Sequence, residues 1–285
     1  MKKRVCLLLI LAVAGGLYAE RRYKIEESEA VQKTLKFQDP AKPKELSVDN
    51  IFGFIHVEGI ESKEVRLSVK KTIKARTSDR LQKAKEEVSL DITEDGNTID
   101  LFVDGPFRDK NDRNRWRQCR DPGYEVHYDF TIKVPLQTSL YLKTVTDGNI
   151  SVKNVEGDFE VKNVNGTIVM TDIAGSGTAH TVNGKVEASF VKNPKSDCSF
   201  KTLNGHLIVL FQPDLSADFW LKTFTGDAYS AFPINYLPSK PGKVFREKGK
   251  YVYEGNKMTG VRIGTGGPEI KMDTMTGDIF IEKFK

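Results

Sequence analysis

The most chemically distinctive stretch of the sequence is "RDKNDRNRWRQCR" at residues 108–120, where arginines flank a tryptophan. Guanidinium groups bind carboxylate, sulfate or phosphate oxygens through paired hydrogen bonds, and an adjacent indole ring adds a cation–π surface. Arg113, Arg115, Trp116 and Arg117 are therefore candidate ligand-binding residues for an anionic polysaccharide, a lipid headgroup or a phosphate. The alternative, a solvated surface loop, is favoured by the polarity of the stretch.

Two further aromatic residues are candidates for binding sugars. Tyr141 and Trp220 fall at outward positions of expected strands, where an aromatic ring can stack on a sugar. Single aromatic residues on a protein surface often have no such role.

Patterns that would indicate catalysis are weak. Asp227 and Asp278 follow glycines in equivalent turns, but other copies of the turn carry unrelated residues there, unlike the paired carboxylates of glycosidases. Ser68 and Lys71 match the SxxK spacing without its companion motifs. The 4 histidines are scattered and show no metal-ligand spacing. We therefore predict no catalytic residue, no metal and no cofactor.

Residues 1–19 have the features of an export signal. A basic "MKKR" precedes the apolar "VCLLLILAV", and Ala19 suits a cleavage site. The apolar run is too short to span a bilayer, and no later segment is long enough. We expect an exported protein of the periplasm or cell surface, with no transmembrane segment after leader cleavage. Because the leader holds three of the 44 Lys and Arg and no acid, against 39 Asp and Glu, the mature chain is nearly neutral, which argues against nucleic-acid binding.

The cysteines leave one pairing open. Cys6 departs with the leader, and Cys119 and Cys198 remain. Two cysteines of an exported protein can form a disulfide. Cys198, however, falls in an inward apolar column beside Phe219 of the next copy, where a free thiol packs as a small apolar group. A free Cys198 is favoured.

A short repeated phrase must position all of these residues. Its copies are "LKTVTDGNI", "VKNVNGTI", "AHTVNGKV", "FKTLNGHL", "LKTFTGDA" and "MDTMTGDI", and "VDNIFGFIHVEGI" (48–60) is a seventh copy upstream. The early copies recur about every eighteen residues, a period typical of solenoid proteins. Each copy reads as two short strands joined by a corner, which we call a coil.

Alternating columns of apolar residues predict which strand faces point inward. Leu142, Phe200, Leu221 and Met272 occupy one inward column. The columns fit either stacked parallel coils or an antiparallel meander. Type I′ hairpins need positive φ at the residue before glycine, which Thr225 would resist, so stacked coils with only the glycine left-handed are favoured. We expect the Thr and Asn side chains of the phrase to hydrogen-bond their equivalents in neighbouring coils.

The rest of the chain surrounds this array. Residues 20–44 read as an N-terminal linker. Residues 45–135 hold the first coil and an excursion expected to cap the coils, with a short helix capped by Ser78. Residues 136–285 hold the other coils, with a second excursion at 233–267. The predicted fold class is all-β: a single-stranded β-solenoid with an N-terminal β/α excursion containing one short helix. One outward column of the second strands is unexpectedly apolar. Either an excursion covers it, or it is a surface that binds a ligand or partner.

The chain resembles the bacterial putative-adhesin family of exported β-strand-repeat proteins, a family of unknown function. The resemblance rests on the leader, on "VDNIFGFIHVEG", "YEVHYDFTIKVP" and the repeated corners, and on the closing "GTGGPEIKMDTMTGDIFI". It spans about residues 45–285. It implies a right-handed β-helix-like fold at the cell envelope and no established reaction.

The leading functional hypothesis is a non-enzymatic cell-envelope protein, adhesin-like or structural, that contacts an envelope protein or a glycan through a long repetitive face. Two alternatives stay open. One is a polysaccharide-active enzyme built on a β-helix, and the other is an envelope sensor that binds an anionic ligand through residues 108–120.

Overall fold

The computed structural model describes residues 23–39, 41–109, 112–116, 121–239, 243–247, 250–254 and 258–284. The chain divides into an N-terminal unit, residues 1–155, and a C-terminal unit, residues 156–285. Among the described residues the fold is all-β with one α-helix. The leader expected at residues 1–19 lies outside the described residues. In the part of the chain described here, no helix has the length and apolar character needed to cross a bilayer.

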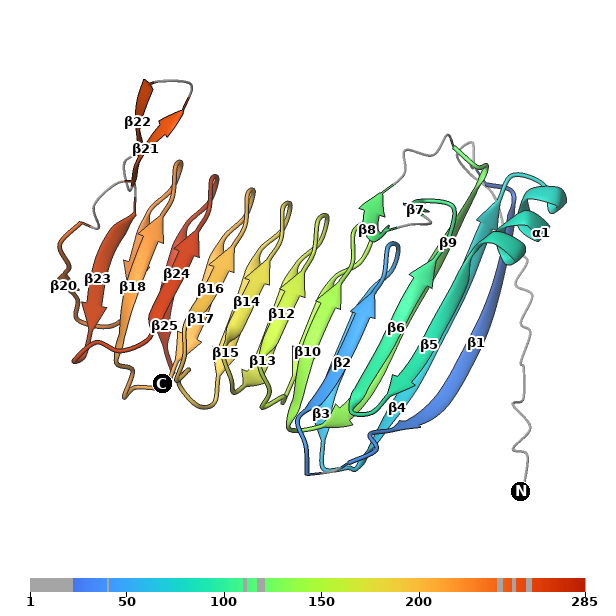
Figure 1. Cartoon of the computed structure of the whole chain (residues 1–285), viewed down its shortest axis with the longest axis horizontal. Coiled ribbons are helices and arrows are strands. Elements are labelled where there is room, and N and C mark those ends of the chain that lie inside the picture. The colour runs from blue at the N-terminus through green and yellow to red at the C-terminus, as the bar shows by residue number, and fades with distance from the viewer. Residues whose placement is uncertain are drawn as a thin grey trace. The chain divides into compact units, whose positions relative to one another are not determined.

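The strands of the N-terminal unit belong to two sheets and one short hairpin. They are β1 (Ile25–Lys36), β2 (Lys44–Asp49), β3 (Ile55–Ile60), β4 (Glu64–Ala75), β5 (Ser89–Asp95), β6 (Thr98–Asp104), β7 (Arg108–Asp109), β8 (Asp112–Trp116), β9 (Tyr124–Pro135), β10 (Thr138–Lys143) and β11 (Ile150–Lys153). Within this unit one sheet has the order β1-β4-β9-β3-β11. The other has the order β10-β2-β6-β5, as Figure 1 shows. β7 and β8 form the hairpin.

The upstream copy of the repeat forms a coil with neighbours on both sides. Its strands β2 and β3 pair in parallel with β10 and β11 of the second copy. On the other side they pair in parallel with β6 and β9. The excursion after the first copy therefore supplies one more coil, and two of its other strands, β4 and β5, pair antiparallel with β9 and β6.

Residues 25–36 are not a linker, as the sequence suggested, but the twelve-residue strand β1, antiparallel to β4 along its whole length. The strand was missed because it lies at a sheet edge, where most side chains are in water and the apolar alternation is weak. Leu35 is buried, whereas Gln32, Lys33 and Thr34 are exposed.

The short helix expected after β4 is α1 (Ser78–Glu87), which packs against β4 and β9. Its N-cap is Thr77 and not Ser78. Thr77 has an extended backbone, and its hydroxyl accepts a hydrogen bond from the Arg80 N–H at 3.3 Å. Threonine caps a helix much as serine does, so the start moves by one residue. Ala84 and Val88 are buried and Leu81 is half-buried, so these residues form the apolar side of the helix and its C-cap.

The C-terminal unit continues with two sheets and a hairpin. Its strands are β12 (Phe159–Lys162), β13 (Ile168–Ile173), β14 (Gly177–His180), β15 (Val186–Phe190), β16 (Cys198–Lys201), β17 (Leu207–Phe211), β18 (Ala217–Lys222), β19 (Ala228–Ser230), β20 (Asn235–Tyr236), β21 (Lys243–Glu247), β22 (Lys250–Glu254), β23 (Thr259–Ile263), β24 (Glu269–Asp273) and β25 (Ile279–Lys283). Within this unit the sheet orders are β13-β15-β17-β25-β19 and β20-β23-β18-β24-β16-β14-β12. The second excursion contains the antiparallel hairpin β21–β22.

Coils of the C-terminal unit pair in parallel, which rules out the antiparallel meander, but their spatial order differs from their order in the chain. The last coil lies between the two before it, because β24 pairs with both β16 and β18, and β25 pairs with both β17 and β19 (Figure 1). Cys198 is therefore in register with Ile270, not with Phe219 as expected. β23 pairs antiparallel with the outer edge of β18, which leaves its inner edge for the returning β24.

The repeated phrase forms the corner between the two strands of a coil, and neighbouring corners touch. The Thr202 hydroxyl donates to the Gly184 carbonyl at 2.8 Å, and Thr181 donates to Gly166 in the same way. A Cβ on Gly205 would lie 2.1 Å from that Gly184 oxygen. The expected hydrogen bonds between equivalent threonines are thus replaced by bonds to carbonyls. The corner glycines Gly184, Gly205, Gly226 and Gly277 have positive φ, as expected, whereas Gly148 and Gly166 do not. At Gly148 glycine is needed for the close approach alone, since an added Cβ would lie 1.9 Å from the Gly53 oxygen.

Asparagine side chains form a second ladder at the same corners. Asn183 donates through Nδ2 to Oδ1 of Asn165, and Asn204 donates likewise to Asn183, both at 2.8 Å. Amide side chains can donate and accept at once, so one residue type continues such a ladder from coil to coil.

The inward columns form the core of each unit. Phe200 and Met272 are fully buried and in register, as predicted, and Leu142 is buried in the N-terminal unit. Six phenylalanines in the described part of the C-terminal unit are buried, and among them the Phe190 and Phe211 rings are stacked with 5.4 Å between centroids. Leu221 is only half-buried, because its coil contains the edge strand β19.

Candidate functional site

The arginine-rich segment contributes little that can be located. Arg113, Arg115 and Trp116 belong to β8, but their side chains lie outside the described residues. Arg117 lies outside them altogether, as does Cys119. The ligand role predicted for this segment therefore stays a prediction.

Arg108, the first arginine of that segment, has a structural role. It is buried and donates to the two carboxylate oxygens of Asp49 at 2.7 and 3.2 Å. Its guanidinium carbon lies 4.6 Å from the centre of the Phe102 ring, and Lys143 Nζ is 3.3 Å from the same carboxylate. A buried cation needs such partners, so Arg108 is not available to a ligand.

Of the two aromatic candidates, only Tyr141 is exposed. Its side chain lies on the outer face of the β10-β2-β6-β5 sheet, with 44% of its surface accessible. Trp220 is 4% accessible, and the prediction that it stacks on a sugar is wrong. The backbone of Gly260 on β23 pairs with Trp220 and leaves no room for a side chain, since an added Cβ would lie 2.7 Å from the indole.

The carboxylates and hydroxyls considered for catalysis have structural partners or lie apart. Asp278 Oδ1 accepts the Asp227 N–H at 2.9 Å, which makes this pair part of a corner. Lys71 Nζ donates to the Val88 carbonyl at 3.3 Å and lies 3.5 Å from Glu29, whereas Ser68 is on the opposite face of β4. The described residues contain no group of His, Cys, Asp or Glu side chains able to hold a metal ion.

Cys198 is a free, buried thiol in its inward column. Its Sγ lies 3.7 Å from the Ser196 carbonyl. Burial raises the pKa of the Cys198 thiol to about 11, because a thiolate would lose its hydration there. A thiol with a raised pKa is a poor nucleophile, so Cys198 packs and does not react.

The apolar outward column on the second strands is partly open in the C-terminal unit. Tyr229 is half exposed, and its ring stacks on Phe280 with 5.1 Å between centroids. Val169, Ile208 and Phe280 are half-buried on the same face in β13, β17 and β25, with Glu187 of β15 between Val169 and Ile208.

A shallow groove of ≈ 350 Å³, which we call the basic groove, lies across β1, β4 and β9. It is lined by Gln32, Lys33, Thr34, Arg66, Leu67, Ser68, Thr131 and Lys133. The registers of the two antiparallel pairs place outward residues in rows, one of which is Gln32–Ser68–Thr131. The next outward row is Thr34–Arg66–Lys133.

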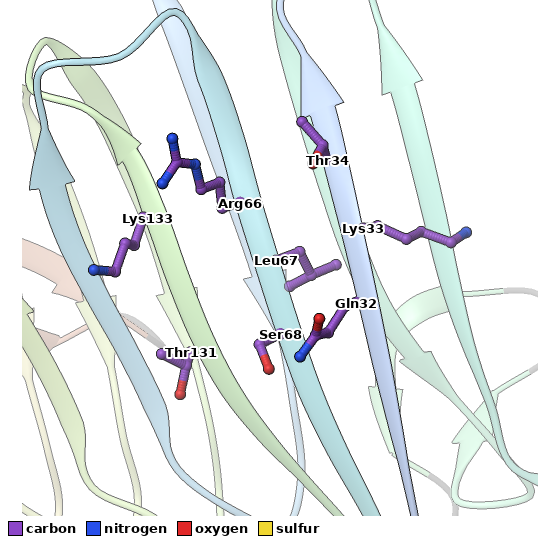
Figure 2. A pocket seen from close by; sticks show the side chains of 8 residues that line it. All are labelled: Gln32, Lys33, Thr34, Arg66, Leu67, Ser68, Thr131 and Lys133. Carbon is purple, nitrogen blue, oxygen red and sulfur yellow. The ribbon is translucent and has the colours of Figure 1, made fainter. Parts of the chain in front are cut away.

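Figure 2 shows how these side chains are directed. Arg66 and Lys133 lie near one another, with Ser68 and Thr131 beside them along the same strands, β4 and β9. Lys33 extends away from this group, as the alternation of strand side chains requires.

Arg66 and Lys133 bring two positive charges together. They are direct cross-strand neighbours, an arrangement that destabilises a sheet when both side chains carry the same charge. Lys133 Nζ is 3.2 Å from Glu58, whereas Arg66 is exposed and has no ion pair with any described residue. An anion between them would remove the repulsion.

Hydroxyl groups complete the groove. Ser68 and Thr131 have no side-chain hydrogen bond with other residues that the structure describes, and each can donate or accept. Together with the guanidinium and ammonium groups they suit a carboxylate or sulfate on a hydroxylated molecule. This arrangement of cations and hydroxyls suits the binding of such an anionic ligand.

These groove residues were not predicted from the sequence. Residues 32, 66 and 133 are far apart in the chain, and their row exists only because β1 and β9 both pair with β4. A signal was present in the alternation of "EVRLSVKK" and "DFTIKVP". It places Arg66 with Ser68, and Thr131 with Lys133, on one face of their strands.

No family model and no curated protein matches this chain. Among solved structures, it is similar to a "putative cell adhesion protein" from Clostridium sporogenes, with 12% identity and a TM-score of 0.40 over 90% of this chain and 100% of that one. It is also similar to a "putative adhesin" from Bacteroides fragilis, with 11% identity and a TM-score of 0.38 over 90% and 97%. A "putative lipid binding protein" from Parabacteroides distasonis shows 15% identity and a TM-score of 0.31 over 90% and 97%. These values are too low to assign a family or a function.

Proposed function

We propose that the chain is an exported, non-enzymatic binding protein of the bacterial cell envelope, an adhesin-like β-solenoid whose basic groove holds an acidic polysaccharide. The observation that carries the proposal is the Arg66–Lys133 pair, two cations on adjacent strands with the Ser68 and Thr131 hydroxyls beside them. Export and the handedness of the solenoid rest on the leader and on the family resemblance of the sequence.

An acidic polysaccharide fits this groove better than a small isolated anion. The groove is shallow and lies on an open sheet face, so it encloses little of a small ligand. A polymer can place a carboxylate or sulfate at Arg66 and its hydroxyls at Ser68 and Thr131, and many weak contacts along its length then add.

Retention on immobilised polysaccharides tests the proposal. We expect the purified protein to bind alginate or dextran sulfate at low salt, to elute as salt rises, and to pass through neutral dextran, because exposed charges are screened over about 10 Å at 0.1 M salt. The double variant Arg66→Glu/Lys133→Glu should lose retention. Lys153→Glu/Lys195→Glu is the matched control, since it makes the same charge change at two exposed lysines outside the groove.

Three results would contradict the proposal. Retention of the double variant equal to that of the parent protein would show that the basic groove does not bind the polysaccharide. Loss of retention only in an Arg113→Ala/Arg115→Ala/Arg117→Ala variant would favour the sensor alternative that uses residues 108–120. New reducing ends or unsaturated products after incubation with the polysaccharides would favour an enzyme.

A further inference from the structure

A second concave site lies in the N-terminal unit, at the end of the sheets where α1 packs. It is a cleft of ≈ 550 Å³, within the range of small-molecule pockets. Aromatic and aliphatic side chains supply most of its wall: Tyr23, Phe52, Phe107, Tyr124, Val88 and Val126. They come from the residues before β1, from the corners before β3 and after β6, from the start of β9 and from the end of α1.

The carboxylates that line the cleft already have partners. Glu87 accepts the Tyr124 hydroxyl and lies 3.5 Å from Lys83 Nζ. Glu125 accepts the Tyr23 hydroxyl at 2.9 Å. The third, Asp121, pairs with Arg76 and accepts the Gly123 N–H at 2.9 Å. Glu87 and Asp121 are therefore each paired with a cation, whereas the partners of Glu125 are the Tyr23 hydroxyl and His127, whose Nε2 lies 3.6 Å away.

Arg80 is the cation lining the cleft that is not paired with one of these carboxylates. Its stem lies against Gly123, where an added Cβ would be 3.5 Å from Arg80 Cγ and Cδ. Its guanidinium makes no hydrogen bond or ion pair with any residue in the described part of the chain, and the side chain is exposed at the cleft. An apolar wall with one exposed cation that has no ion pair with a described residue is complementary to a molecule with an apolar body and an anionic end.

We propose that this cleft binds a single-chain amphiphile with an anionic head group. The hydrocarbon chain lies against the aromatic walls, where burying it is favourable. The head group stays at the opening on Arg80, because an unpaired anion inside the cleft would lose its hydration. Fatty carboxylates and alkyl phosphates share this chemistry.

Binding of four probes tests the proposal. Oleate, dodecanoate and dodecyl phosphate are used below their critical micelle concentrations, and the neutral methyl oleate below its solubility limit. We expect saturable one-to-one binding of at least one anionic probe by isothermal titration calorimetry. Methyl oleate should bind about tenfold more weakly, the loss expected for one charge-assisted hydrogen bond. Comparison of dodecanoate with dodecyl phosphate, which have the same chain length, shows which head group is preferred.

Variants separate this site from the basic groove. Arg80→Glu changes an exposed residue. It should reduce the affinity for the anionic probe at least tenfold and leave the affinity for methyl oleate unchanged. Phe107→Ala should weaken both probes, with thermal melting to confirm folding. Arg66→Glu should leave amphiphile binding intact, so failure of the polysaccharide proposal does not affect this one. The inference is overturned if no anionic probe saturates at one site, or if Arg80→Glu binds it as the parent does.

Discussion

The hydroxyl of Thr202 donates a hydrogen bond to the carbonyl oxygen of Gly184 in the neighbouring coil at 2.8 Å. The same carbonyl occupies the space that a Cβ of Gly205 would need. One residue of the phrase therefore holds the neighbouring coil, and another makes room for it. This relationship explains why threonine and glycine recur together at a fixed separation.

Thr202→Val should destabilise the protein by about 1–2 kcal/mol, because the buried hydrogen bond to Gly184 is lost while the side-chain shape is kept. Urea denaturation followed by circular dichroism measures the change. Thr178→Val on β14 is the matched control, since Thr178 is exposed and the change there should stay within about 0.5 kcal/mol. Equal effects at the two sites would show that the corner hydrogen bond contributes nothing.

Gly205→Ala should cost about 2–4 kcal/mol, since the new Cβ would lie 2.1 Å from backbone and the coils would have to separate. Gly96→Ala provides the comparison. Gly96 has φ +57° but nothing within 4 Å of an added Cβ, so only the backbone preference is lost, about 1 kcal/mol. Thermal melts of the two variants test which substitution is more destabilising. A smaller effect at Gly205 than at Gly96 would contradict the close contact between corners.

Cysteine pairs should report the spatial order of the coils. Lys201 and Asp273 are partners on adjacent strands, as are Lys222 and Asp273, so Lys201 and Lys222 are two strands apart. Lys201→Cys/Asp273→Cys should oxidise to a disulfide, because neighbouring strands lie about 4.8 Å apart. Lys201→Cys/Lys222→Cys should not, and mass spectrometry of peptides distinguishes the two. The opposite result would show that the coils are stacked in the same order as they occur in the sequence.

The Cys198 thiol should make stability depend on alkaline pH. Its pKa is raised by burial from 9.0 to about 11, so the folded state retains the proton that the unfolded state loses in this window. The contribution is fully present below pH 9 and is lost as pH rises to 11, by up to about 2–3 kcal/mol. The difference in unfolding free energy between the parent and Cys198→Ala should narrow over this range. A constant difference from pH 8 to 11 would show that the thiolate is not disfavoured by folding.

Local pattern was enough to predict the β-class, the corners, the inward columns and the short helix. Leu142, Phe200 and Met272 alternate with polar residues, and side-chain alternation is a property of each strand by itself. The same reasoning failed for Trp220, whose neighbours come from β23, and for residues 25–36, whose partner is β4.

The candidate sites were beyond local pattern for the same reason. Arg66 and Lys133 meet only because β4 and β9 pair in one register, and Arg80 reaches the aromatic cleft only because α1 packs beside the start of β9.

The sequence by itself determined that copies of one strand–corner–strand phrase would repeat and which of their faces would be apolar, since both follow from residues close together in the chain. Only the tertiary structure decided which copies are neighbours and which charges and rings share a surface. Equivalent coils offer nearly equal edges to one another, and the long connections between them let the chain return to an edge that the order of its residues does not specify.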